Sequence, residues 1–153
     1  MKVIFLDVDG VMISEESFLL TMALGGRVVI FSRKAMKALK LLVKRTGAVV
    51  VLTSSWRPMP AYGPTRSYQQ LCSSLQRNET PLYGLTPWLE DQDHDRSDEI
   101  LAWLAEHPAE RFVIIDDNNR FRNHPELKER WVQIDPLHGL TRADAERAAA
   151  LLE

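Results

Sequence analysis

Residues 3–11 read VIFLDVDGV, and this stretch decides the fold. Its first four residues are apolar and three of them are β-branched or aromatic, which is typical of a short strand buried on both faces. Asp7 and Asp9 follow at once, although an unpaired charge is costly inside a core. We therefore expect both acids at the exit of the strand, where open α/β sheets bind ligands, with Gly10 turning the chain after them.

Two further apolar runs end in the same way. Residues 48–52 (AVVVL) lead into Thr53 and Ser54, and residues 112–115 (FVII) lead into Asp116 and Asp117. A shorter run at residues 131–134 predicts a fourth strand. Because the exits of parallel strands share one edge of a sheet, the polar residues after these runs are expected to meet in one crevice.

Helices are predicted between the strands. Ser32 is a suitable N-cap for a helix over 33–45, which Gly47 ends, and Thr65 is a suitable cap for the next. Residues 97–99 (SDE) predict another helix start, and Thr141 begins a final helix with a capping-box-like pattern. Strands that alternate with helices predict an α/β fold with a mainly parallel sheet and helices on both faces.

Two segments have weaker patterns. Residues 12–31 are interpreted as a short strand-and-turn excursion that forms a flap over the exit of the first strand. Residues 78–95 are interpreted as an irregular segment with a solvated acidic run near its end. Neither the region from Val11 to Ser32 nor the region from Pro58 to Asp95 is long enough for a full lid domain.

Composition places the chain among ordinary globular proteins. With 153 residues and 45% hydrophobic residues, one domain over 1–153 is expected. A net charge of −2 gives no general attraction to nucleic acid. The single cysteine, Cys72, excludes an internal disulfide and is interpreted as a small hydrophobic core residue. No signal peptide or membrane-spanning run is recognised, so the cytoplasm is the expected location.

The crevice would contain four carboxylates, from Asp7, Asp9, Asp116 and Asp117. Several like charges in a half-buried site require a cation, and oxygen ligands favour a hard ion such as Mg²⁺. A dication beside hydroxyl groups and an arginine suggests a phosphoryl group as the ligand. One carboxylate can attack phosphorus, and a second can give and take a proton.

The pattern resembles the haloacid dehalogenase-like (HAD) phosphatases. Asp7-Val8-Asp9-Gly10 resembles their first motif, residues 50–54 the second, Arg96 the basic third, and residues 114–117 the fourth. The resemblance implies a Rossmann-like three-layer sandwich with a minimal cap or none. It also implies that Asp7 is the nucleophile and Asp9 the general acid/base. Mg²⁺ would be held by Asp7, the Asp9 carbonyl, and Asp116 or Asp117, while Arg96 and the hydroxyl of Thr53 or Ser54 contact the phosphoryl group.

A narrower resemblance is to the small HAD domains associated with RNA-repair proteins. It is carried by residues 54–57 (SSWR), 84–87 (GLTP), 96–100 (RSDEI) and Asp116-Asp117. It implies a substrate with a terminal phosphate on a nucleic acid or nucleotide. Trp56 either stacks a base or packs on the sheet edge. The residues expected to contact the substrate are Gly10, Ser55, Trp56 and Arg57. Other basic residues that either contact phosphate or are simply solvated are Arg66, Arg77, Arg120, Arg122, Lys128 and Arg130.

The leading hypothesis is a Mg²⁺-dependent phosphatase that works through an aspartyl-phosphate. One alternative is a non-catalytic module that only binds phosphorylated ligands, although such a module has no need of Asp9. Another is a phosphotransferase that passes the phosphoryl group to an acceptor other than water.

Overall fold

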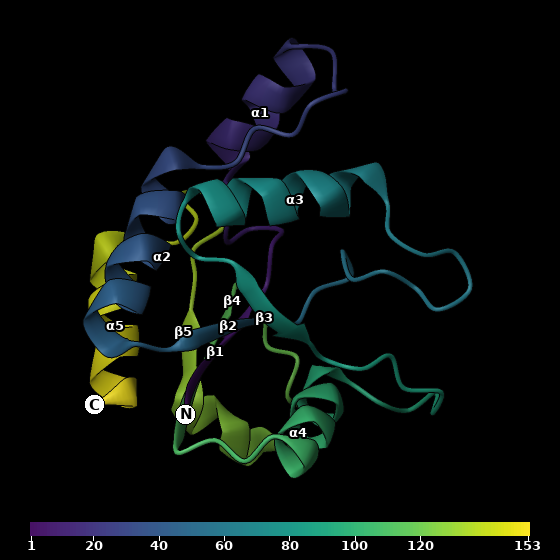
Figure 1. The fold of residues 1–153 in the computed structure, drawn as a ribbon, viewed down its shortest axis with the longest axis vertical. Coiled ribbons are helices and arrows are strands. Elements are labelled where there is room, and N and C mark those ends of the chain that lie inside the picture. Colours follow the sequence, from purple (N-terminus) through teal and green to yellow (C-terminus); the bar gives the residue numbers. More distant parts are fainter.

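The computed structural model, which describes residues 1–153, contains one sheet of five parallel strands in the order β3-β2-β1-β4-β5 (Figure 1). The strands are β1 (Lys2–Leu6), β2 (Val49–Leu52), β3 (Leu82–Leu85), β4 (Arg111–Asp116) and β5 (Trp131–Gln133). The helices are α1 (Glu15–Ala23), α2 (Arg33–Thr46), α3 (Arg66–Arg77), α4 (Arg96–Glu106) and α5 (Arg142–Leu152), with a 3-10 helix η1 (Pro125–Arg130).

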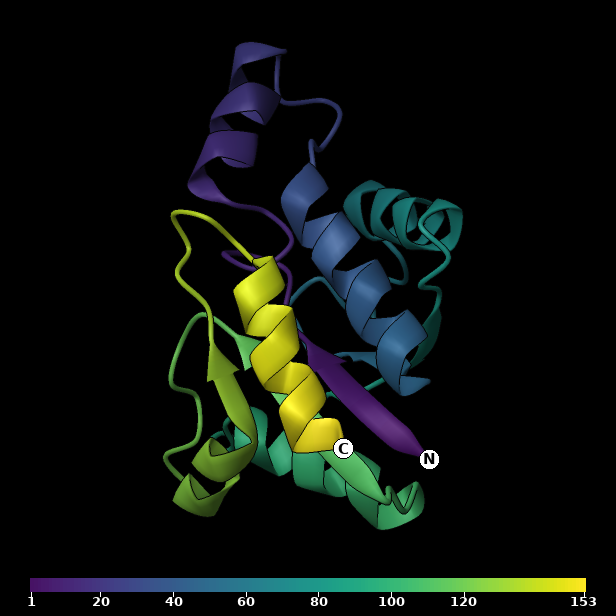
Figure 2. The same cartoon turned by 90° about the vertical axis from the view of Figure 1, so that its left-hand side faces the viewer.

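The sheet is the middle of three layers because its strands bury both faces. Ile4 and Leu6 of β1 belong to a core cluster formed with α2, α3 and α5. Val3 and Phe5, which alternate with them, pack against α4 on the other face, where Phe5 meets Trp103 edge-on. Figure 2 shows α2 and α5 side by side across the first of these faces. The predicted α/β three-layer fold is confirmed.

The strand register brings the predicted polar residues to one edge. Leu6 is aligned with Leu52 of β2 and with Ile115 of β4. The alignment continues one residue further, because the N–H of Thr53 donates to the Leu6 carbonyl at 2.9 Å. The N–H of Asp7 likewise donates to the Ile115 carbonyl at 3.0 Å. The exits of the three central strands are therefore adjacent.

Three of the predicted helices begin and end where their capping residues indicate. The Ser32 hydroxyl caps α2, and Gly47 ends it in the left-handed conformation. Thr65 caps α3. Thr141 and Asp144 form a reciprocal capping box at the start of α5. These local hydrogen bonds involve residues close in sequence, which is why sequence patterns identify them.

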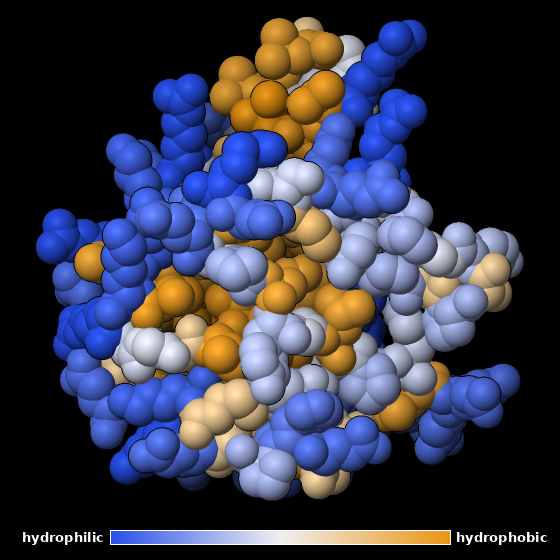
Figure 3. Space-filling view, viewed as in Figure 1, coloured by the Kyte–Doolittle hydropathy of each residue, from blue (hydrophilic) through white to orange (hydrophobic).

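The strand-and-turn interpretation of residues 12–31 is wrong, because the segment forms helix α1. Ser14 and Ser17 make a capping box at its start, and the Thr21 hydroxyl accepts the N–H of Ile30 at 2.8 Å. The polar Ser17 and Thr21 face the body of the protein, whereas apolar side chains face outward (Figure 3). This inverted arrangement hides the usual amphipathic signal. None of the helices has the length and apolar character needed to span a membrane.

Strand β3 was not predicted, since residues 78–95 were interpreted as irregular. β3 is a four-residue edge strand that pairs with β2 through an irregular register. Its Gly84 leaves room for Trp103, whose indole nitrogen lies 3.4 Å from the position that a Cβ would occupy. A short edge strand with a central glycine has little sequence signal of its own.

Candidate functional site

Three acids meet at the edge formed by β1 and β4. Asp7, Asp116 and Asp117 each place one carboxylate oxygen within 4.8 Å of the others. Asp7 is 3% exposed and Asp116 is fully buried. One buried oxygen of each carboxylate has no hydrogen-bond partner. Because like charges repel strongly in such surroundings, the set fits a hard divalent cation bound through oxygen.

The pKa values of the clustered acids also favour a bound cation. Burial, together with the charge of Asp116, raises the pKa of Asp7 to about 8, although Arg96 opposes the shift. Burial also raises the pKa of Asp116, against the N–H of Asn118 and the charge of Arg120. Without a counter-ion the cluster therefore retains a proton near neutral pH, and a cation would allow it to ionise.

Arg96 reaches this cluster from the first turn of α4, as the sequence predicted. One guanidinium nitrogen lies 3.8 Å from the Asp7 carboxylate, and the side chain is 9% exposed. Its Nε lies 3.3 Å from Glu99, one turn further along the helix. Glu99 also forms a buried ion pair with Arg57, so it joins two arginines behind the acids.

Arg57 is expected to contact the substrate, but its guanidinium makes buried contacts that hold loops together. It is 3% exposed. Its guanidinium donates to the carbonyls of Ser54, Thr86 and Pro87 at 2.7–2.9 Å, and it pairs with Glu99. These contacts tie the loop after β2 to the loop after β3 and to α4. The geometry favours a positioning role for Arg57.

Asp9 lies apart from the acidic cluster. The chain turns immediately after β1, where the Val8 carbonyl accepts three backbone N–H groups, so Asp7 and Asp9 do not share an extended backbone. The Asp9 side chain is exposed, and its carboxylate accepts the indole N–H of Trp56 at 3.0 Å. Trp56 also packs against Phe31. The indole thus holds the acid that the sequence assigned to proton transfer.

The hydroxyl pair follows β2 at the same edge of the sheet as the acids. Thr53 and Ser54 are both fully buried. Thr53 accepts a hydrogen bond from the Thr86 hydroxyl, and Ser54 accepts the N–H of Trp56, each at 3.2 Å. Each hydroxyl has one hydrogen-bond partner in the protein and can make one more hydrogen bond. The next residue, Ser55, is exposed and lines a neighbouring cavity.

Position 10 requires glycine because of its backbone conformation and because the Asp117 side chain lies close to it. Its φ is +76°, and a Cβ built there would lie 2.3 Å from a carboxylate oxygen of Asp117. The expected substrate contact of Gly10 stays a prediction. Its structural effect is to let Asp117 approach the loop after β1.

We expect Gly10→Ala to destabilise the protein by about 1–3 kcal/mol and to weaken divalent-cation binding. The methyl group would displace Asp117, and alanine is strained at this φ. Thermal unfolding with and without Mg²⁺ measures both effects. Gly47→Ala is the matched control, because Gly47 also has a positive φ but no atom within 4 Å of the added Cβ. Equal losses of stability and of Mg²⁺ binding in the two variants would contradict the role assigned to Asp117.

Two cavities of different character open beside the acids. One, of about 490 Å³, is lined by Ser55, Arg57, Trp88, His94, Asp95, Arg96, Glu99, Asn119, Arg120 and Arg122. We call it the arginine cavity. The other, of about 430 Å³, is lined by Asp9, Gly10, Ile13, Ser14, Glu15, Phe18, Leu19, Asp117 and Pro136, and so reaches α1.

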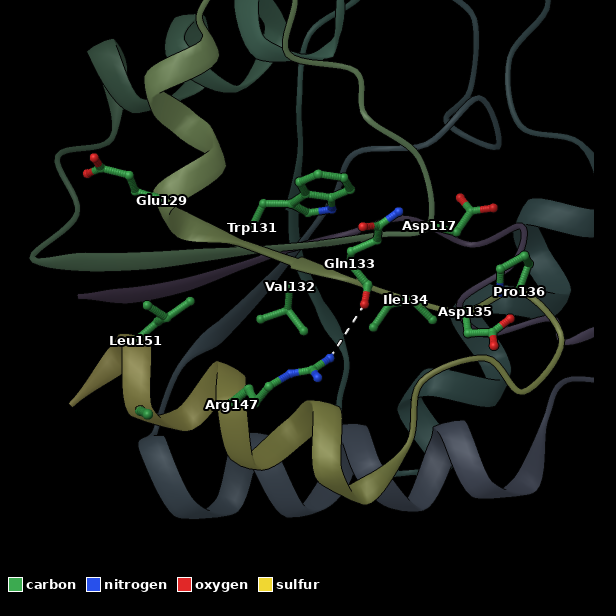
Figure 4. A pocket seen from close by; sticks show the side chains of 11 residues that line it. Asp117, Glu129, Trp131, Val132, Gln133, Ile134, Asp135, Pro136, Arg147 and Leu151 are labelled. Atoms are coloured by element: carbon green, nitrogen blue, oxygen red, sulfur yellow. Dashed lines mark hydrogen bonds between the residues drawn. The ribbon is translucent and has the colours of Figure 1, made fainter.

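A larger cavity, of about 900 Å³, lies between β5 and α5 (Figure 4). Arg147 crosses it from α5 to the Gln133 carbonyl, and Asp117 stands at one end. Of the three clustered acids it contains only Asp117. This larger cavity therefore does not coincide with the acidic cluster.

Comparison with known protein families identifies the family of this chain. The family model described as "HAD domain in Swiss Army Knife RNA repair proteins" matches residues 3–145, which is most of the chain. No curated protein and no solved structure gives a significant match.

Proposed function

Because the chain belongs to the family of HAD domains in Swiss Army Knife RNA repair proteins, we propose that it is a Mg²⁺-dependent phosphomonoesterase that forms an aspartyl-phosphate. The observation that carries the proposal is the buried cluster of Asp7, Asp116 and Asp117 with Arg96 beside it. Family membership supports phosphatase-type chemistry. We also propose that residues 1–153 act as one catalytic domain.

The metal would be held by Asp7, Asp116 and Asp117, with the Asp9 carbonyl as the further ligand that the family resemblance implies. Their unpartnered oxygens support this assignment. When bound, Mg²⁺ would neutralise the carboxylates and stabilise negative charge on the phosphoryl oxygens. The guanidinium of Arg96 and a hydroxyl from Thr53 or Ser54 would orient that phosphoryl group.

The chain's own residues then divide the reaction into two displacements. The Asp7 carboxylate forms a bond to phosphorus while the bond from phosphorus to the leaving oxygen breaks, and Asp9 gives that oxygen a proton. In the second step Asp9 takes a proton from water, whose oxygen attacks phosphorus and breaks the acyl-phosphate bond. The products are the alcohol and inorganic phosphate, and Asp7 is regenerated. Trp56 positions Asp9 through its indole N–H.

The proposed substrate is a terminal phosphate on a nucleic acid or a nucleotide. The family description names RNA repair proteins, which supports this class. The segment between β1 and α2 contributes a single helix, α1, and not a full lid domain that would cover the site.

The proposal is tested by hydrolysis of p-nitrophenyl phosphate and of a phosphorylated oligonucleotide, with Mg²⁺ and with EDTA. We expect turnover that depends on the metal. Phosphate binding without turnover on a broad substrate panel would instead identify a non-catalytic module. Transfer to an added alcohol in preference to water would identify a phosphotransferase.

We expect Mg²⁺ to bind more tightly at pH 8 than at pH 6. Because the pKa of Asp7 in the metal-free protein is raised to about 8, its carboxyl holds a proton at pH 6 that the cation must displace. Two pH units correspond to a loss of up to about a hundredfold in affinity. Isothermal titration calorimetry at both pH values measures the change. An affinity independent of pH would show that Asp7 is not a ligand.

A further inference from the structure

We propose that the arginine cavity binds a second phosphate group of the substrate, next to the phosphate that is removed. The inference rests on the proposed phosphatase activity and specifies its substrate class. It starts from the residues of the cavity that the catalytic mechanism leaves unused, above all Arg122.

The arginine cavity adjoins the acidic cluster at its inner end. Arg96 and Arg120 both line it. Arg96 lies 3.8 Å from the Asp7 carboxylate, and Arg120 lies 3.4 Å from that of Asp116. A molecule with one phosphate at Asp7 therefore has its neighbouring groups beside these two guanidinium groups.

The outer part of the cavity has one arginine that no carboxylate neutralises. Four arginines line the whole cavity, but Arg120 is already paired with Asp116. Glu99 is already paired with Arg57 and Arg96, and the Asp95 carboxylate accepts the backbone N–H groups of Ser97 and Asn123. Arg122 is exposed and forms no ion pair or hydrogen bond within the protein. Its guanidinium is free to bind an anion.

The second cavity beside the acids, which reaches α1, has the opposite charge. Asp9, Glu15 and Asp117 line it, and no basic residue does. A second anionic group would be repelled there and attracted by the arginines. The two cavities thus fix the direction in which a polyanionic substrate lies across the site.

A phosphate is the anion that this cavity fits best. Guanidinium groups present planar pairs of N–H donors that match phosphate oxygens, and several converge here. The volume of about 490 Å³ also leaves room for the sugar between two phosphates. The second phosphate would come either from the backbone of a nucleic acid or from a nucleoside bisphosphate.

The test compares three substrates in Arg122→Ala and in the wild type. These are p-nitrophenyl phosphate, adenosine 3′,5′-bisphosphate and a short RNA with a terminal phosphate. We expect the ratio of kcat/KM for the RNA to kcat/KM for p-nitrophenyl phosphate to fall about tenfold, since one charge-assisted hydrogen bond is lost. The slope of log RNA affinity against log salt concentration should also become shallower by about one, which corresponds to one phosphate contact.

Arg111→Ala is the matched control. Arg111 is an exposed arginine at the start of β4, at the opposite end of the strand from the acids, so the variant removes the same charge without touching the cavity. Its substrate ratios should equal those of the wild type. Equal melting temperatures would show that both variants fold.

The outcomes separate the two proposals. A loss for the RNA alone identifies backbone phosphate as the ligand, and a loss for both larger substrates identifies a second phosphate from either source. An unchanged ratio in an active enzyme overturns the second-phosphate site and leaves the phosphatase proposal intact. If no substrate is turned over, the phosphatase proposal fails, and fluorescence anisotropy with labelled RNA decides the site. Equal binding by Arg122→Ala and the wild type would then overturn it.

Discussion

Replacing Asp7 with asparagine should lower kcat for p-nitrophenyl phosphate by about a thousandfold or more. The amide cannot form an acyl-phosphate, and it removes one of the three negative charges that would hold the metal. The measurement is steady-state hydrolysis with Mg²⁺ in excess. Activity within about tenfold of the wild type would exclude the aspartyl-phosphate mechanism.

The pH dependence of stability supplies the control for Asp7→Asn. Since the folded-state pKa of Asp7 is raised from its ordinary value of 3.8 to about 8, the folded protein binds more protons than the unfolded chain between these values. Stability of the metal-free wild type therefore falls as pH rises through that window. Asp7→Asn should not show this fall, and at pH 8 without metal it should be at least as stable as the wild type. Asp93→Asn, an exposed change of the same chemistry, should alter neither property.

Replacing Glu99 with glutamine should destabilise the protein by about 3–5 kcal/mol. The variant keeps the shape of the side chain but leaves the buried guanidinium groups of Arg57 and Arg96 without their shared carboxylate. For a chain of this length the expected fall in Tm is about 10 °C. Thermal unfolding at neutral pH measures it.

Glu106→Gln is the control for that substitution. Glu106 is an exposed residue at the other end of the same helix, so its neutralisation should change Tm by about 1 °C or less. Glu99→Gln should also raise KM, since Arg96 loses the partner that holds it beside Asp7. A Tm equal to that of the wild type would show that the two arginines do not depend on Glu99.

The central strands and their exits could be predicted because they leave continuous signals. A parallel strand covered on both faces reads as an unbroken apolar run, as in residues 3–6 and 112–115. The elements that could not be predicted, α1, β3 and the short 3-10 helix η1, lack such a signal. Helix α1 exposes its apolar side chains, and β3 is a short edge strand with a glycine. Their structure depends on neighbours that are distant in sequence.

The candidate site also contains some residues whose positions the sequence predicts and others whose positions it does not. The acids Asp7, Asp116 and Asp117 lie together as the alignment of strand exits predicted, and Arg96 lies beside them as the family resemblance implied. Glu99 was read only as an acid suited to a helix start. Its i,i+3 spacing from Arg96 was the available signal for their ion pair.

The remaining contacts could not be read from the sequence. The link between Trp56 and Asp9, and the burial of Arg57, arise where separate loops meet. Loops have no periodicity, so their contacts appear only once the sheet has brought them together.

The central position of β1 also governs the order in which the molecule can assemble. Val3 pairs with Val49 on one side and with Phe112 on the other. The hydrogen bonds of β1 are therefore complete only after residues that are very distant in sequence have joined the sheet. Folding dominated by such distant pairings is slow. Because Asp7 and Asp116 extend from two of these strands, the carboxylate trio is assembled by the same late event. A folding intermediate that lacks β4 would therefore have no place to capture a divalent ion.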